Sequence, residues 1–139
     1  MGTSHEKGRG WQPISLGKDI PAPKGAYTPV VRAGDFIHVS GQVPRDPRTG
    51  ETVGDDIRSQ TRQVISNVSE ALGTAGATLD DVCAVTVYLA SADLWTEFND
   101  EYKSLMTPPY PARTAVGADL RGMLVEITVV AYKPAGGGG

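Results

Sequence analysis

Cysteine and histidine are scarce in this chain, which contains one cysteine, Cys83, and two histidines, His5 and His38. A single cysteine excludes a disulfide bond within the chain. One cysteine and two histidines that lie far apart in the sequence are poor candidates for the ligands of a zinc ion, so we expect no metal site. Cys83 lies in an apolar run without a basic neighbour, and we interpret it as a buried, unreactive side chain.

The common sequence motifs of nucleotide-binding proteins and of serine hydrolases are also missing. The chain contains no Gly-x-Gly-x-x-Gly, no P-loop and no Gly-x-Ser-x-Gly, the motifs of dinucleotide binding, phosphate binding and serine hydrolases. We therefore expect a protein without a cofactor.

Long apolar runs and an excess of positive charge are absent too. No stretch approaches the roughly 18 apolar residues of a transmembrane helix, so we expect no membrane partner. The net charge is −3 and the isoelectric point about 5.3, which argues against a nucleic-acid partner. The polar N-terminus lacks the apolar segment of a secretory signal, and we expect a cytoplasmic protein.

The 139 residues are enough for one domain with a hydrophobic core. We expect this domain to span residues 13–135, between flexible ends at 1–12 and 136–139. Hydrophobic periodicity predicts one helix over 55–75 and a second one capped by Asp93. Strands are predicted at 27–32, 36–40, 82–90, 112–116 and 123–132. The predicted fold class is α+β, a mixed sheet with two helices packed on one face.

Alternate residues of the last predicted strand form two apolar faces, Val125, Ile127, Val129 and Ala131 on one and Leu124, Val130 and Tyr132 on the other. Two helices can cover only one of these faces. The second face would be unfavourable in water, so the pattern predicts a homo-oligomer that buries it. Glu126 shares the second face and would therefore lie near a subunit boundary.

The most informative pair of residues is Arg113, at the start of one predicted strand, and Glu126, inside the next. Arginine binds a carboxylate through two parallel hydrogen bonds, and an acid among β-branched residues needs a partner or a function. Together they predict a site for a small carboxylate with an acid that can move a proton. The ordinary explanations are a surface salt bridge for Arg113 and a structural ion pair with Arg113 or Lys133 for Glu126.

Other candidate residues have ordinary explanations as well. Tyr27 would be a half-buried packing residue, and Ser40-Gly41 the end of a strand. Trp95 belongs to the apolar stripe of the second helix, as core or as pocket wall. Asn99, beside that stripe, is either solvated or a hydrogen-bonding residue of a pocket.

Seven segments support a family assignment when they are taken in order: 25–27, 39–44, 46–51, 80–82 leading into 86–89, 98–102, 111–113 and 125–127. With these segments, residues 21–134 resemble the Rid family of reactive intermediate deaminases, also called the YjgF or L-PSP family. The resemblance implies a chorismate-mutase-like fold and a homotrimer with sites at the subunit interfaces. It also implies a cofactor-independent hydrolase of C=N bonds, which converts enamines and imines of the 2-aminoacrylate type to 2-keto acids and ammonia, like a 2-iminobutanoate/2-iminopropanoate deaminase.

The resemblance assigns roles to individual residues. Arg113 would bind the carboxylate of the imino acid, and Glu126 would position and activate the attacking water. The expected substrate-binding residues, of which all but Trp95 and Ala115 fall at the family's pocket positions, are Tyr27, Ser40, Gly41, Trp95, Asn99 and Ala115. Ala115 stands where many members carry a cysteine, and the segments 103–112 and 119–122 look shorter than in the archetypal deaminase.

Three other functions remain open at this point. The Arg113 pocket would equally suit a noncatalytic protein that binds or senses keto acids. A pathway-specific Rid relative would act on another enamine. An endoribonuclease, a label that the family sometimes carries, is disfavoured by the acidic isoelectric point and by the lack of a histidine acid–base pair.

Overall fold

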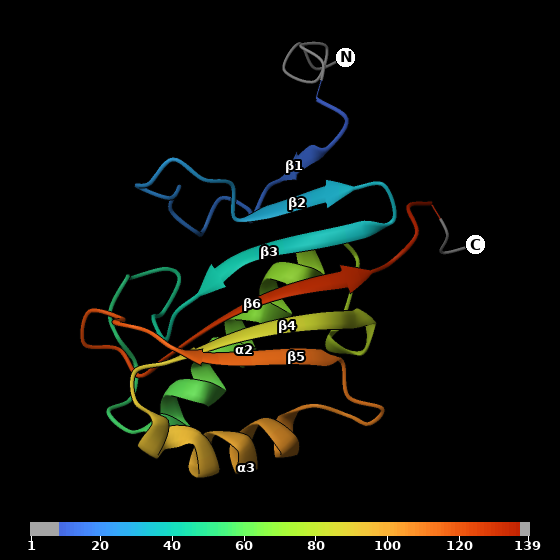
Figure 1. The fold of residues 1–139 in the computed structure, drawn as a ribbon. Helices are drawn as coiled ribbons and strands as arrows, with labels where there is room; N and C mark the ends of the chain where they lie inside the picture. The colour runs from blue at the N-terminus through green and yellow to red at the C-terminus, as the bar shows by residue number, and fades with distance from the viewer. Residues whose placement is uncertain (1–8, 137–139) are drawn as a thin grey trace.

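The computed structural model of the protein describes residues 9–136, so that most of the two ends expected to be flexible lies outside the described residues. Within this range the chain forms six strands and two α-helices (Figure 1). In chain order they are β1 (Gln12–Ile14), β2 (Val30–Ala33), β3 (Phe36–Gln42), α2 (Ile57–Thr74), β4 (Val82–Leu89), α3 (Trp95–Leu105), β5 (Ala112–Gly117) and β6 (Val125–Tyr132).

The strands form one mixed sheet in the order β1-β2-β3-β6-β4-β5. Neighbouring strands are antiparallel except β4 and β5, which are parallel and are connected through α3. Helix α2 packs on β3 and β6, and α3 packs beside α2, on the same side of the sheet (Figure 1). This arrangement confirms the predicted α+β class, with two helices on one face of a mixed sheet.

The hydrophobic core lies between the helices and this face of the sheet. The predicted alternation of β6 is confirmed, because Val125, Ile127, Val129 and Ala131 are all buried in the core. On the other side of β6, which we call the open face, Glu126 is half-buried and Tyr132 is exposed. No described element of the chain packs on the open face as the helices do on its opposite.

The helices begin and end largely where their sequences predict. The Asp56 side chain caps α2 by accepting a hydrogen bond from the Ser59 backbone N–H at 2.8 Å. Gly76, with φ of +81°, turns the chain after the end of α2. The predicted cap at Asp93 is wrong, because a 3₁₀ turn (Ala92–Leu94) leads into α3 and Ser91 caps that turn.

Three further local predictions are corrected by the structure. The lead-in that looked irregular contains β1, which pairs with β2. The strand expected from residue 27 begins only at Val30. Before it, the Thr28 carbonyl oxygen accepts a hydrogen bond from the Ser40 hydroxyl at 2.7 Å. Cys83 is exposed instead of buried, because a register shift between Val82 and Ala84 turns it out of the core-facing row.

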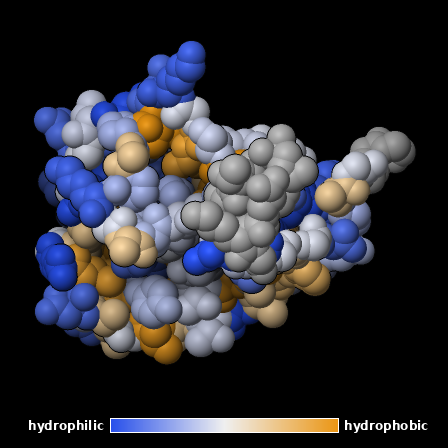
Figure 2. All heavy atoms as spheres, turned by 90° about the horizontal axis from the view of Figure 1, so that it is seen from above, coloured by the Kyte–Doolittle hydropathy of each residue, from blue (hydrophilic) through white to orange (hydrophobic). Residues whose placement is uncertain are grey.

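Seen from the β1 side of the sheet, hydrophobic residues form small separate patches among hydrophilic ones (Figure 2). In the part of the chain that the structure describes, neither helix has the length and apolar composition required to cross a membrane.

Candidate functional site

Arg113 lies on the helix-covered side of the sheet, held between aromatic rings. It is level with Val85 of β4, which is buried beneath the helices. Its guanidinium carbon is 4.9 Å from the centre of the Trp95 ring and 4.7 Å from that of Tyr102, both on α3. These cation–π contacts orient the guanidinium while leaving its N–H groups available. None of the ion pairs between described residues involves Arg113.

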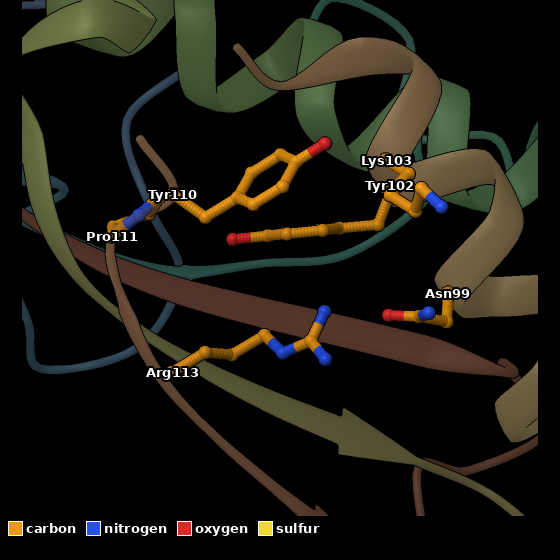
Figure 3. A pocket seen from close by; sticks show the side chains of 6 residues that line it. All are labelled: Asn99, Tyr102, Lys103, Tyr110, Pro111 and Arg113. Atoms are coloured by element: carbon orange, nitrogen blue, oxygen red, sulfur yellow. The ribbon is translucent and has the colours of Figure 1, made fainter. Parts of the chain in front are cut away.

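A cavity of about 370 Å³ opens beside the guanidinium, between α3 and the loop that precedes β5. Besides Arg113 it is lined by Asn99, Tyr102, Lys103, Tyr110 and Pro111. In Figure 3 the side chains of Asn99 and Arg113 point toward one another, and the Tyr102 ring lies between Arg113 and Tyr110. A cation beside an amide makes the cavity suitable for a small carboxylate, with Asn99 as a pocket residue.

Sequence reasoning missed part of this cavity. Tyr102 belongs to the same apolar stripe as Trp95, which was expected to be core or pocket wall, and Lys103 and Tyr110 were not among the expected site residues. A signal was available, since residues 99, 102 and 103 are spaced to share one side of a helix that also carries Trp95. Tyr110 reaches the cavity because of the path of the loop before β5, and the path of a loop leaves no periodic pattern in the sequence.

Tyr102 is almost entirely buried, with 2% of its surface exposed, and its hydroxyl has no hydrogen-bond partner among the described residues. Burial raises the pKa of Tyr102 above its ordinary value, and the positive charge of Arg113 opposes that change only in part. The phenol is therefore neutral at physiological pH. It supports Arg113 through its ring, without neutralising the guanidinium charge that a ligand would use.

A second group of the predicted residues gathers on the other side of the molecule, where β3 ends. Glu126 lies so close to Gly41 that a methyl group added at Gly41 would overlap its carboxylate. Ser40 holds the segment that follows Tyr27, and Tyr27 and Gly41 line the same cavity of about 160 Å³. Tyr27 itself is 55% exposed. Gly41 thus provides room for the acid, and the Ser40 hydroxyl holds the backbone next to Tyr27.

The structure does not bring Arg113 and Glu126 together within one chain. Through β4, Arg113 is level with Val85 and Glu126 with Tyr88. Three residues along the strands and two strand spacings separate their backbones, about 14 Å, and their side chains lie on opposite faces of the sheet. The predicted residues therefore divide into two groups, Arg113, Ala115, Trp95 and Asn99 on one face and Glu126, Gly41, Ser40 and Tyr27 on the other. Between residues 9 and 136, no three His, Cys, Asp or Glu side chains are grouped to hold a metal ion.

Comparison with known proteins decides the family. The family model described as endoribonuclease L-PSP matches residues 17–133, most of the chain. The chain belongs to the endoribonuclease L-PSP family. This membership confirms the resemblance noted from the seven sequence segments, because Rid proteins are among its structural neighbours.

Relatives of this L-PSP family protein carry several names. A RutC family protein of Pyrococcus horikoshii is 41% identical over 84% of this chain and 94% of its own length. A 2-iminobutanoate/2-iminopropanoate deaminase of Bos taurus is 34% identical, covering 86% of this chain and 88% of the relative. The crystal structure of RidA from an Antarctic Psychrobacter has a TM-score of 0.79 and 32% identity, covering 87% of this chain and 98% of that one. At the coarse level of the family, these names support a Rid-type enamine or imine deaminase.

Proposed function

We propose that this protein hydrolyses 2-imino acids and their enamine tautomers to 2-keto acids and ammonia, at sites shared between the subunits of a homotrimer. The observation that carries the proposal is the state of Arg113. Its guanidinium is stacked on two rings, has no ion-pair partner among the described residues, and faces a cavity that also contains Asn99. A site built in this way suits the carboxylate of an imino acid.

The reaction requires little more than positioning and one proton relay. Water adds through its oxygen to C2 of the iminium, R–C(=NH₂⁺)–COO⁻, and forms a C–O bond. Glu126 takes a proton from that water and returns it to the nitrogen. The C–N bond then breaks as the hydroxyl oxygen forms the C=O bond, and Glu126 passes the hydroxyl proton to the departing NH₃. The products are R–CO–COO⁻ and NH₄⁺. In favourable cases positioning lowers such a barrier by about 7 kcal/mol, and general acid–base catalysis raises the rate by a further factor of about 10²–10⁴.

The division of the site into two groups supports the oligomeric part of the proposal. In one chain Glu126 lies on the open face and cannot reach a ligand on Arg113, about 14 Å away on the other face. A second copy packed on the open face would bury apolar side chains and could bring its Arg113 group next to the Glu126 group of the first. Each site would then take Arg113, Trp95 and Asn99 from one subunit and the Glu126 group from its neighbour.

Glu126 and Gly41 together define the catalytic half of the proposed site. Gly41 has no side chain, and this lets the carboxylate lie directly against the end of β3. The close approach places backbone groups of residues 40–42 near the acid, where a substrate could also hydrogen-bond. Tyr27, half exposed beside Gly41, would close one wall of the site when the neighbouring subunit is present.

The experiment is keto-acid release from imines that an amino-acid oxidase generates in a coupled assay. Arg113→Ala should lower kcat/KM by about 10²-fold or more, because two charge-assisted hydrogen bonds to the carboxylate are lost. Arg113→Lys should recover only part of this, since an ammonium lacks the planar fork. Arg48→Ala is the matched control; Arg48 pairs with Glu70 on the exposed surface of α2. An unchanged rate in Arg113→Ala would overturn the proposal, as would tight binding of keto acids without turnover of any imine.

A further inference from the structure

The helix-covered side of β5 carries progressively smaller side chains after Arg113. Residues at every second position share a face of a strand, so Arg113, Ala115 and Gly117 form one row. Across from this row, the connection between β4 and α3 contributes the small residues Ser91 and Ala92. The result is a hollow of about 250 Å³, here called the β5 groove, lined by Ser91, Ala92, Trp95, Ala115 and Gly117 together with Leu89 and Val116.

The β5 groove adjoins the Arg113 site. Trp95 contacts the Arg113 guanidinium at 4.9 Å and also forms a wall of the groove. At its far end the groove shares Ser91, Ala92 and Gly117 with a shallower hollow that follows residues 118–124. Because Ala115 follows Arg113 in the same row of β5, the side chain of a ligand held by its carboxylate at Arg113 could extend over Ala115 into the groove.

The chemistry of the two sides of Arg113 differs. The cavity on the α3 side contains Lys103, Asn99 and two tyrosines, and an apolar group placed there would remove polar groups from water without replacing their hydrogen bonds. None of the residues that line the β5 groove is ionisable. An apolar substituent therefore gains most by lying in the groove, against the Trp95 ring.

We propose that the β5 groove selects imino acids with a large apolar side chain, branched aliphatic or aromatic, over those with a methyl group. This inference rests on the proposed function and adds the class of substrate. Each additional buried CH₂ group favours binding by about fourfold. The imine derived from leucine, with three more side-chain carbons than that from alanine, should consequently show a kcat/KM at least about tenfold higher.

Two substitutions fill the groove from different ends. Ala115→Leu narrows it beside Arg113. Gly117→Val narrows it farther along, where an added Cβ meets only the Leu89 carbonyl oxygen at 3.8 Å, an ordinary contact, so the fold should tolerate it. Ala135→Leu, at an exposed position beyond β6, is the matched control. The measurement is the ratio of kcat/KM for the leucine-derived and alanine-derived imines, which both groove variants should lower by at least about tenfold and the control should not.

A binding experiment separates this inference from the proposed function. By calorimetry, 4-methyl-2-oxopentanoate should bind at least about tenfold more tightly than pyruvate, and Gly117→Val should remove the difference. If no imine is turned over but this preference and its loss are observed, the proposed function fails and the groove assignment stands. Equal kcat/KM for the two imines, or a parallel loss for both in the groove variants, would overturn the groove assignment while leaving the deaminase intact.

Discussion

The proposed division of the site between subunits can be tested with a mixture of two variants, each of which should be inactive alone. Arg113→Ala removes the carboxylate anchor, and Glu126→Gln removes the proton acceptor while keeping the shape of the side chain. Because the two residues lie on opposite faces of the sheet in one chain, each variant should retain one intact half of the site. Co-refolded oligomers that contain both chains should then form some complete sites.

The recovered activity can be calculated from the arrangement. A complete site needs Arg113 from a Glu126→Gln chain and Glu126 from a neighbouring Arg113→Ala chain. With equal amounts and random assembly, each condition is met half of the time, so about one quarter of the sites are complete in any closed ring of subunits. If both residues served a site within one chain, no chain in the mixture would contain a complete pair and nothing would be recovered.

The assay is keto-acid release in the coupled reaction, before and after the mixed variants are unfolded in denaturant and refolded together. We expect about one quarter of the wild-type rate after co-refolding, and no gain when each variant is refolded separately. Co-refolded wild type with Glu126→Gln is a useful control for losses during refolding. Activity of the mixture no greater than that of the separate variants would refute the division of the site between subunits.

Two further predictions concern residues that support the site. Tyr102→Phe removes a buried hydroxyl without a partner and keeps the ring against Arg113, so urea unfolding should show about 1 kcal/mol more stability with kcat unchanged within twofold. Burial raises the pKa of Tyr102, so above about pH 10 the phenol ionises in the unfolded chain before it does so in the folded one, and the folded protein loses stability as pH rises further. The stability advantage of Tyr102→Phe should therefore be larger at pH 11 than at pH 8, and an equal advantage at both would contradict this reasoning. Gly41→Ala should displace the Glu126 carboxylate and lower kcat by about 10²-fold. The melting temperature should change little, because only the flexible end of the Glu126 side chain has to move. A normal kcat would show that catalysis does not need the carboxylate at this position.

The elements with strong periodicity could be predicted from the sequence, and the reason is burial. The helix expected over 55–75 is observed at Ile57–Thr74 and the strand expected over 82–90 at Val82–Leu89. Both have an apolar row that packs in the core, and such rows are visible in sequence. By contrast, β1 has only three residues and includes Pro13, and it exists through its pairing with β2. Pairing between distant segments leaves no periodic signal in a stretch this short.

The candidate site residues stay a prediction, and their arrangement in space could not be read from the sequence. Alternation along β6 placed Glu126 on the face away from the helices, and the structure agrees. The β5 sequence Ala-Arg-Thr-Ala-Val-Gly has no apolar row that would reveal which way Arg113 points. Its direction follows from the parallel register with β4, where Arg113 is level with Val85. Cys83 illustrates the same limit, since one register shift in β4 reversed the side expected for it.

The register of β5 and β6 also explains why a pair of residues that looked like one site in sequence lies on opposite faces of the sheet in each chain. A shift of either strand by one residue would reverse its faces and place Arg113 and Glu126 on the same side. That alternative is prevented by the core, because a shifted β6 would expose Val125, Ile127 and Val129 and bury Glu126 beneath α2. The same apolar row that stabilises the fold therefore keeps the acid away from its own arginine. Under the proposed function, catalysis depends on assembly for a reason fixed in the core of the folded chain.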